Sequence, residues 1–398
     1  MSPTARREPS QRPARSFARP ASPRVSRPAP PARPPRRARP ERDRRRRDAK
    51  PKPTFKENVR FYVKAILIIL VVRAFLIEPY RIPSESMEDT LLVGDFLIVS
   101  KLHYGARTPA TLGIPVTGLF VPGLEIPQTR LPGFDDPDRG DVVVFNYPAD
   151  LDVERGPISE AVPIERRTPY IKRIVAVPSD TVAVLDKVVH LNGHPVPLGP
   201  TMQQRWTVRQ TGMTRPDAEL LERLGVEPLD GTARLATAQG PVLYDVFATT
   251  AEAQALAARS DVAAVEPSVT PEEARDQTFG RNPDHMAPFV VPGKGMAVRL
   301  SDATWATYGD ILTRYEGRTV TRSADGGFLV DGRPTEVYPF RQNYYFVMGD
   351  SRDNSVDGRY WGVVPETHLV GRALFTFISF KSWLPPIPRL TRFFRPIP

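Results

Sequence analysis

Two kinds of side chain in this sequence could together carry out nucleophilic catalysis. Ser84 and Ser86 stand in a turn after Pro83, and Lys172 stands in the apolar run Tyr170–Val177. A serine hydroxyl is a poor nucleophile at neutral pH and needs a neighbouring base. A lysine can be that base, because desolvation disfavours the ammonium form and lowers the pKa of the amine. Each residue alone also fits an ordinary turn serine or a solvent-facing strand lysine, so the predicted pair depends on further motifs.

A third segment, Met348–Gly362, is dense in Asp, Asn, Ser and Gly. Its D-x-D/N spacings occur in calcium loops, but a bidentate Glu is missing at the required distance, and Arg352 and Arg359 interrupt the segment. An Arg/Asp network that braces a catalytic turn is the better interpretation. The chain has no cysteine and five scattered histidines, so thiolate sites and disulfides are excluded, and we expect no metal and no cofactor.

Together the three segments resemble the signature motifs of bacterial type I signal peptidases, also called leader peptidases. The family motif P-S-x-S-M is matched by Pro83–Met87, Y-I-K-R by Tyr170–Arg173, and G-D-x-R-D-N-S-x-D-x-R-Y-W-G by Gly349–Gly362. The motifs occur in the family's order, and the resemblance covers roughly 58–195 and 335–380. The middle of the chain and its N-terminal tail lie outside it.

The resemblance implies a role for each matched polar residue. Ser86 would attack the scissile carbonyl, and Lys172, neutral in the resting enzyme, would accept its proton. The Ser84 hydroxyl and the Ser86 backbone N–H would form an oxyanion hole, in which one donor is typically worth about 100- to 1000-fold in rate. Ser355 would orient the Lys172 ammonium, as a third residue does in other triads.

Further matched residues would support the site or hold the substrate. The supporting ones are Asp357 with Arg359, an ion pair, and Asp350 with Arg352, which would hold the turn. The substrate-binding ones are Tyr80, Ile82, Tyr170 and Ile171, on strands that would clamp an extended peptide by backbone hydrogen bonds. Shallow apolar pockets there would favour Ala-x-Ala-like sites in the signal peptides of exported preproteins. Glu85, at the variable position, and Ser351, where many relatives carry Asn, touch no catalytic role.

The element that must position this site begins directly before the serine turn. Val59–Ile77 is a run of 19 mainly apolar residues, close to the roughly 20 that cross a bilayer as a helix. Lys64 and Arg73 lie near its ends, where long basic side chains can reach the headgroups. We therefore predict a transmembrane helix at 58–77, with a buried or interfacial helix as the alternative. It follows a long charged tail and lacks an adjacent A-x-A-like site, so it reads as an anchor rather than a removed signal peptide.

The tail, 1–57, is rich in Pro and Arg and is predicted to be disordered, because it has almost no apolar surface to bury. The chain carries a net charge of +10, whereas residues 1–50 alone carry +13. By the positive-inside rule the tail is cytoplasmic and the rest is periplasmic, in a single-pass protein of the bacterial inner membrane. Because the body of the chain is slightly acidic, no nucleic-acid partner is expected. The expected partners are signal peptides, the lipid bilayer and the secretion translocon.

Short β-branched and aromatic runs, punctuated by Gly, Pro and Asp, predict a mainly β protein. We expect an antiparallel barrel- or sandwich-like catalytic domain in two parts, 78–194 and 336–380. Between them, 195–335 reads as an inserted α+β accessory region, with helical texture at 217–226 and 250–265. The Pro-rich tail 381–398, with scattered Trp, Phe and Arg, fits a segment that lies on lipid.

Two other kinds of protein share part of this pattern. A self-cleaving repressor of the SOS type uses a Ser/Lys pair, but it predicts a soluble protein with a helix-turn-helix that contacts DNA. A non-enzymatic, membrane-anchored β-domain would make the serines and the lysine structural. The hydrophobic segment and the three ordered motifs favour the peptidase over both.

Overall fold

The computed structural model describes residues 54–108, 111–114, 119–125, 129–149, 151–152, 156–157, 162–213, 218–229, 234–235 and 241–398. Apart from its last residues, 54–57, the tail predicted to be disordered lies outside the described residues.

The predicted hydrophobic helix is present as α2 (Phe55–Phe75). It begins after Thr54, whose hydroxyl accepts a hydrogen bond from the Glu57 backbone N–H, while the Glu57 carboxylate accepts one from the Thr54 N–H. This reciprocal arrangement is a capping box, and it satisfies donors that a helix start leaves open. Among the residues that the structure describes, no helix combines the length and the apolar character that a membrane crossing requires. The predicted transmembrane span is therefore not confirmed.

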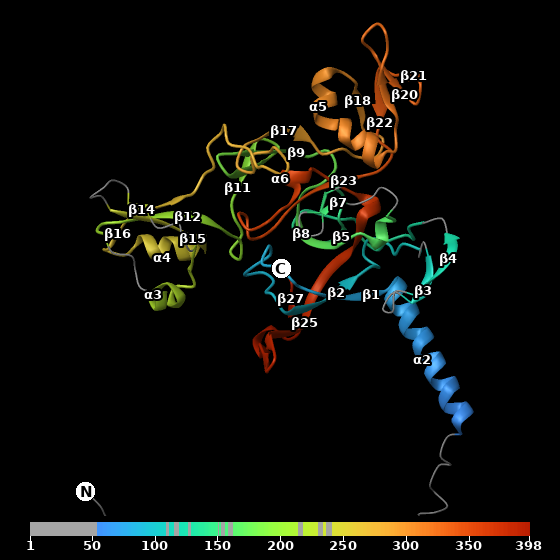
Figure 1. Cartoon of the computed structure of the whole chain (residues 1–398), viewed down its shortest axis with the longest axis horizontal. Helices are drawn as coiled ribbons and strands as arrows, with labels where there is room; N and C mark the ends of the chain where they lie inside the picture. The colour runs from blue at the N-terminus through green and yellow to red at the C-terminus, as the bar shows by residue number, and fades with distance from the viewer. Residues whose placement is uncertain are drawn as a thin grey trace, which may run out of the picture. The chain divides into compact units, whose positions relative to one another are not determined.

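The main sheet has nine strands, joined in antiparallel pairs in the order β1-β2-β25-β5-β8-β23-β24, with β26 and β27 also paired to β25. The prediction of a mainly β fold with antiparallel sheets is confirmed. Strands from the two ends of the chain alternate in this sheet (Figure 1). Their bounds are β1 (Ile77–Arg81), β2 (Asp95–Ser100), β5 (Val142–Asn146), β8 (Pro169–Ala176), β23 (Tyr344–Met348), β24 (Val364–Pro365), β25 (Leu369–Trp383), β26 (Pro386–Pro388) and β27 (Arg395–Pro396).

The centre of this sheet is buried on both faces. In β5, Val142 and Val144 belong to one hydrophobic cluster, whereas Val143 and Phe145 belong to another. A strand buried on both faces has no polar side to present, which explains the uninterrupted apolar run of this segment. β5 lies next to β8 and holds it in register, with Val143 opposite Lys172.

A second sheet of four strands carries a tight hairpin. Its order is β11-β10-β9-β17, with bounds β9 (Thr181–Leu185), β10 (Val188–Leu191), β11 (His194–Val196) and β17 (Met286–Val290). Asp186 and Lys187 join β9 to β10, with φ values of 47° and 71°. Two successive residues with positive φ are the mark of a two-residue turn whose twist matches that of the strands.

The interval 195–335, predicted as an accessory region, is divided into several parts. Its first part is a sheet in the order β13-β15-β12-β16, with the short strand β14 also paired to β15. Apart from β14, the chain runs β-α-β-β-α-β, as in ferredoxin-like folds. We call residues 203–267 the accessory module; it has its own hydrophobic core. Its elements are β12 (Gln203–Gln210), α3 (Ala218–Arg223), β13 (Glu227–Pro228), β14 (Arg234–Leu235), β15 (Val242–Thr249), α4 (Thr250–Ala257) and β16 (Val262–Pro267).

The chain then returns through β17 to pair with β9, and so rejoins the sheet of the hairpin. A further group of elements follows, whose apolar side chains share one cluster with Phe346 and Met348 of β23. These elements are β18 (Ala297–Arg299), α5 (Asp302–Asp310), the π-helical turn η2 (Ile311–Tyr315), β19 (Val320–Arg322), β20 (Phe328–Val330), β21 (Arg333–Pro334) and β22 (Val337–Pro339). Among the described residues of this interval, only the accessory module has a core of its own.

Shorter elements complete the described chain. They are β3 (Thr111–Ile114), β4 (Leu119–Glu125), β6 (Leu151–Asp152), β7 (Gly156–Pro157), η1 (Ile164–Arg166), α6 (Gly358–Trp361), η3 (Glu366–His368) and η4 (Leu390–Arg392). The Pro-rich end of the chain is thus partly strand, because β26 and β27 pair with β25.

Candidate active site

The structure brings Ser86 and Lys172 together from segments 86 residues apart. Lys172 Nζ lies 2.6 Å from Ser86 Oγ and donates a hydrogen bond of 3.0 Å to the carbonyl oxygen of Ile171. Both residues are buried, at 9% and 3% exposure. Burial in apolar surroundings disfavours the ammonium form of a lysine. The pair therefore has the separation and the environment that proton transfer from a hydroxyl to an amine requires.

A cavity of about 310 Å³ opens beside this pair. Ser84 is half-buried in its wall, so both predicted serines face the same space. The Lys172 amine also lies 5.7 Å from the centre of the Tyr170 ring. The lining residues are Ser84, Glu85, Ser86, Tyr170, Lys172, Asp353, Asn354, Ser355, Val356 and Tyr360.

The loop after β23 packs against the serine turn at very close range. The Ser351 N–H donates a hydrogen bond of 3.2 Å to the carbonyl oxygen of Ser86. A Cβ placed on Gly349 would overlap both that carbonyl and the Ser355 hydroxyl. Only glycine fits here, because the backbone of one loop touches the backbone of the other.

Ser355 lies in the cavity wall, but the predicted hydrogen bond from it to Lys172 is not formed. Its Oγ is buried and, within the described part of the chain, has no hydrogen-bond partner. A buried hydroxyl without a partner is destabilising, and such groups are uncommon in folded proteins. Ser355 thus has a free hydroxyl in the wall that also contains the Lys172 amine.

The predicted ion pair of Asp357 and Arg359 is present and buried. The guanidinium donates two hydrogen bonds of 2.9 Å to the carboxylate, and the Gly349 N–H donates a third of 3.0 Å. Burial opposes ionisation of Asp357, but the Arg359 charge and these hydrogen bonds outweigh it and lower the pKa of the carboxyl group. Through the Gly349 N–H, this ion pair fixes the position of Gly349. Because Gly349 has no side chain, the serine turn can pack directly against it.

Asp350 and Arg352, which were predicted to hold the turn, lie in the loop after β23 and contact different partners. Asp350 is held by Arg173, the residue after Lys172, through two hydrogen bonds of 2.9 and 2.7 Å. Arg352 instead approaches the sulfur of Met202 at 3.2 Å, and burial lowers its pKa to about 10. In β8 the side chains alternate, so Arg173 points to the face opposite Lys172, toward the loop after β23. Arg173 stood in the Y-I-K-R motif, but the sequence contained no sign of its partner.

The four residues predicted to bind substrate differ in exposure. Tyr80, Tyr170 and Ile171 are half-buried, whereas Ile82 is 2% exposed and packs inside a hydrophobic cluster. On the side of β8 that faces β23, strand pairing begins at Arg173, so residues 169–172 form an open edge there within the described structure. Tyr170 is the only one of the four in the cavity lining, and it also packs against Tyr147, with ring centres 4.7 Å apart.

Sequence reasoning also missed a contact with the accessory module. The Gln203 N–H donates to the Asp350 carbonyl at 3.0 Å, and the Arg352 N–H donates to the Gln203 carbonyl at 2.8 Å. The Gln203 amide also donates to the Ser351 hydroxyl at 3.1 Å. Gln203 belongs to no motif, so nothing in the sequence could have indicated that β12 touches the loop that packs against Ser86.

A β-rich fold that buries a serine hydroxyl against a lysine amine has the parts of a serine hydrolase. The comparisons with known proteins narrow this class. The family model described as signal peptidase, peptidase S26, matches residues 55–235 and 309–378. The chain therefore belongs to the signal peptidase family, peptidase S26, and is a serine endopeptidase.

Individual relatives agree with this family. The chain is 28% identical over 351 residues to signal peptidase I of Pseudomonas fluorescens, which covers 85% of this chain and 76% of the relative. It is 26% identical over 329 residues to signal peptidase I of Aquifex aeolicus, which covers 82% and 83%. A third relative, signal peptidase I of Pseudomonas aeruginosa, is 26% identical over 351 residues, covering 85% and 76%.

Proposed function

We propose that this protein removes N-terminal signal peptides from exported preproteins, using Ser86 as the nucleophile and Lys172 as the general base. The observation that carries the proposal is the buried contact of 2.6 Å between Ser86 Oγ and Lys172 Nζ. Membership of the signal peptidase family supports the substrate class.

In the proposed reaction, the neutral amine of Lys172 takes the proton of the Ser86 hydroxyl as the oxygen attacks the scissile carbonyl. The lysine ammonium then gives this proton to the leaving amine, and an acyl-enzyme on Ser86 remains. Water then attacks the acyl carbonyl while Lys172 accepts its proton. The ester bond to Ser86 Oγ breaks, the carboxylic acid product leaves, and the lysine ammonium returns the proton to Ser86 Oγ. The Ser355 hydroxyl, buried and unpartnered in the described structure, can accept a hydrogen bond from the ammonium when it forms.

An oxyanion hole of two donors is part of the same proposal. The donors are the Ser84 hydroxyl and the Ser86 N–H. Ser84 lines the cavity beside Ser86, and within the described residues the Ser86 N–H has no backbone acceptor. Donors fixed in advance around a developing oxyanion cost no reorganisation when the charge appears.

An extended substrate would bind as a strand beside the open edge at 169–172. Its backbone groups would pair with the N–H and C=O groups of β8 that point away from β5, in the manner of β-augmentation. The cavity of about 310 Å³ is small, and the proposed catalytic side chains line it. It therefore suits small side chains before the scissile bond, as in Ala-x-Ala sites.

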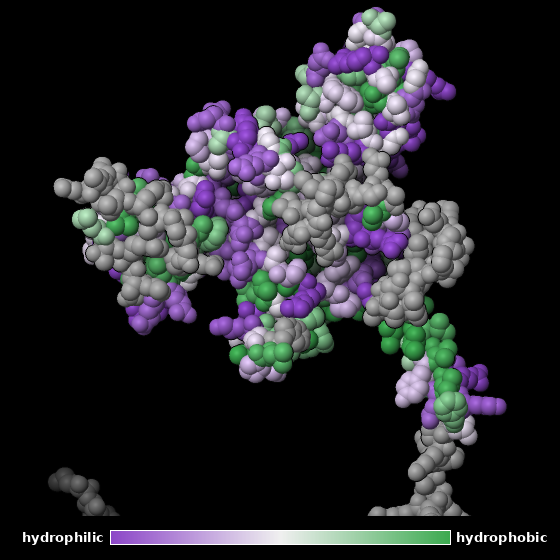
Figure 2. Space-filling view, viewed as in Figure 1, coloured by the Kyte–Doolittle hydropathy of each residue, from purple (hydrophilic) through white to green (hydrophobic). Residues whose placement is uncertain are grey.

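We further propose that α2 and the end of the chain hold the enzyme at a lipid surface. α2 has no buried residue, and Figure 2 shows apolar residues along it. Its exposed large apolar side chains are Phe55, Val59, Phe61, Tyr62, Val63, Ile66, Leu67, Ile68, Ile69 and Val71. At the other end, Leu384, Ile387, Leu390 and Phe394 are exposed as well. Retention at the membrane would raise the effective concentration of the active site near inserted signal peptides.

The repressor alternative requires a helix-turn-helix, and residues 54–81 form one helix followed by one strand instead. An anchored β-domain without activity would leave the burial of Lys172 against a hydroxyl without a function. Cleavage assays distinguish the alternatives directly.

To test the proposal, the detergent-purified protein is given a preprotein with an Ala-x-Ala site, and cleavage is followed on gels and by mass spectrometry. Ser86→Ala and Lys172→Ala should each lose at least about 1000-fold in rate. The matched controls are Ser260→Ala and Lys294→Ala, because both residues are exposed and outside the cavity. Wild-type rates in both cavity variants would overturn the assignment.

Membrane association is tested separately, by carbonate extraction of membranes that contain the full chain. The protein should stay with the membranes. Its appearance in the soluble fraction would refute the lipid-surface proposal while leaving the catalytic one intact.

A further inference from the structure

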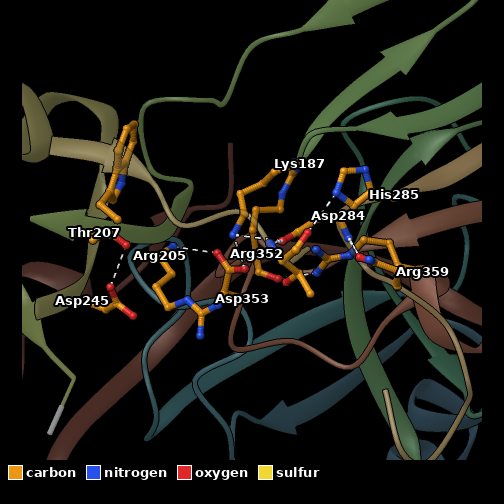
Figure 3. A network of polar contacts seen from close by, with 12 residues as sticks. Lys187, Arg205, Thr207, Asp245, Asp284, His285, Arg352, Asp353 and Arg359 are labelled. Atoms are coloured by element: carbon orange, nitrogen blue, oxygen red, sulfur yellow. Dashed lines mark hydrogen bonds and ion pairs between the residues drawn. The ribbon is translucent and has the colours of Figure 1, made fainter. Parts of the chain in front are cut away.

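A second buried lysine lies close to the cavity. Lys187 stands at the tip of the hairpin β9–β10, and its side chain is only 3% exposed. Its Nζ lies 2.5 Å from Asp353 Oδ1 and 3.6 Å from Asp284 Oδ2. Figure 3 shows Lys187 pointing down between these carboxylates. A buried ammonium is retained only when it is paired, so this lysine has been placed to neutralise specific partners.

Asp353 is the partner that connects this lysine to catalysis. It lines the same cavity as Ser86 and Lys172. Its Oδ1 faces Lys187, and its Oδ2 accepts a hydrogen bond of 2.6 Å from the Arg205 N–H. The two oxygens of one carboxylate are therefore engaged by the hairpin of the catalytic part and by β12 of the accessory module (Figure 3).

The loop that carries Asp353 is tied to the nucleophile on its other side. β12 meets this loop in a parallel bridge between Gln203 and Ser351, and the Ser351 N–H donates to the Ser86 carbonyl. Displacement of Asp353 would consequently be transmitted through two residues of backbone to Ser86.

Other charged groups near Lys172 and Asp353 must be considered before charge is assigned to either. At Lys172 the neighbouring titratable groups in the cavity wall are Glu85, Tyr170, Asp353 and Tyr360. Asp357 also interacts with Lys172, but its charge is balanced by Arg359 within the same motif. Around Asp353 the groups are Lys187, Asp284, Arg359 and Tyr360.

Two carboxylates line the cavity wall near Lys172, those of Glu85 and Asp353. Glu85 is exposed, and its Oε2 accepts from the Asn354 amide at 3.2 Å, so water screens its charge. Asp353 is more buried, with 11% of its side chain exposed. Its ion-pair partner, Lys187, lies outside the motif Gly349–Gly362. An uncompensated carboxylate at that place would favour the ammonium form of Lys172 and thereby oppose its action as a base.

We infer that Lys187 is a positioning residue for the active site: it neutralises Asp353 in the cavity wall and ties the hairpin β9–β10 and the accessory module to the loop behind Ser86. The inference rests on the proposed role of Lys172 as the base. It gives the hairpin and β12 a part in catalysis that none of the three signature motifs contains.

The pH profile of kcat/KM separates this role from simple support of the fold. The acid limb of the profile reports the deprotonation of the free enzyme's base. Lys187→Met leaves Asp353 uncompensated, so we expect the acid limb to move up by about 0.5 to 1 pH unit. Asp353→Asn removes a negative charge from the cavity wall and leaves Lys187 paired with Asp284 alone, so the limb should move down. Lys187→Met combined with Asp353→Asn should return it to near the wild-type position.

Opposite shifts with recovery in the double variant have no explanation in a purely structural role, which would lower the rate in both single variants at an unchanged pH midpoint. Lys187→Arg should keep the wild-type midpoint, since it keeps the charge. Lys294→Met is the matched control, because it removes an exposed lysine that forms no ion pair within the described residues. If Lys187→Met does not fold, Asp353→Asn and the double variant still decide the matter.

The result that overturns the inference is an unchanged midpoint in Asp353→Asn, or a double variant whose midpoint stays with that of Asp353→Asn instead of returning toward the wild type. Failure of the proposed function has a different signature: Lys172→Ala would then cleave at the wild-type rate, whatever the Lys187 variants do.

Discussion

Arg173 and Asp350 form a bidentate ion pair, with hydrogen bonds of 2.9 and 2.7 Å, between the strand that carries Lys172 and the loop that lies behind Ser86. Both side chains are buried, at 9% and 1% exposure. Two consecutive residues of β8 thus hold the two halves of the candidate site: Lys172 faces Ser86, and Arg173 fixes the loop that packs against the serine turn.

Removal of one member of this pair should destabilise the fold. Asp350→Ala leaves an unpaired buried guanidinium, and the expected loss is about 3–5 kcal/mol in the free energy of unfolding. Urea unfolding followed by tryptophan fluorescence measures it. The exposed pair Arg223–Glu219, at 3.6 Å, is the control, and Glu219→Ala should cost less than about 1 kcal/mol. Equal costs for the two variants would contradict the importance given to burial.

Gly349→Ala should damage the site more than the fold. The added methyl group would overlap the Ser86 carbonyl and the Ser355 hydroxyl, so the serine turn has to move. We expect a loss of at least about 100-fold in kcat/KM, because displacements of about 1 Å have such effects at active sites. Gly212→Ala is the matched control, since a Cβ at Gly212 meets no atom within 4 Å. Full activity in Gly349→Ala would show that the turn can relax around a methyl group.

The sequence predicted well those features that depend on local pattern. Alternation along β8 predicted that Lys172 lies on the same face as Tyr170 and Ile174. In the structure all three side chains lie on that face of the sheet. The helix of the hydrophobic segment was expected at 58–77 and runs from Phe55 to Phe75. Its start was missed because a capping box adds a turn of polar residues before the apolar run.

Contacts between distant segments could not be predicted in the same way. Asp350 was predicted to hold the turn together with Arg352, but the sequence did not indicate its ion-pair partner, Arg173, which the sheet brings from 177 residues away. The accessory module was expected only as α+β texture, since its pairing of β12 with both β15 and β16 depends on tertiary register. The contact of Gln203 with the loop after β23 has no local sequence signature.

Ser355→Ala should separate stability from activity. The Ser355 hydroxyl is buried without a hydrogen-bond partner within the described residues, so its removal should leave the free energy of unfolding unchanged or raise it slightly. If the hydroxyl stabilises the Lys172 ammonium during turnover, kcat should fall by about 10- to 100-fold. Thermal unfolding and steady-state kinetics on the same preparation measure both. A destabilised variant with normal kcat would assign Ser355 to the fold instead.

Ser84→Ala tests the proposed oxyanion hole. Loss of one such donor should lower kcat by about 100- to 1000-fold and leave KM nearly unchanged, because the donor acts on charge that develops only in the transition state. Steady-state cleavage of an Ala-x-Ala peptide at several concentrations separates the two constants. A rise in KM at constant kcat would make Ser84 a substrate-binding residue rather than an oxyanion donor.

His368 should make the fold sensitive to mild acid. Burial, together with the nearby charges of Arg167 and Arg107, lowers the pKa of His368 to about 3 in the folded protein. An unfolded histidine has a pKa of about 6.5, so the unfolded state binds the extra proton between these values. The contribution of His368 to stability is therefore complete above about pH 6.5 and falls as the pH drops toward 3, by at most about 1.4 kcal/mol per pH unit.

His368→Gln should remove this contribution. The free energy of unfolding, measured with urea, should then fall less steeply between pH 6.5 and 4.5 in His368→Gln than in the wild type. The exposed His194 supplies the control, His194→Gln, which should keep the wild-type slope. Equal slopes for wild type and His368→Gln would mean that His368 is protonated in the folded protein, and that the buried ring tolerates its charge.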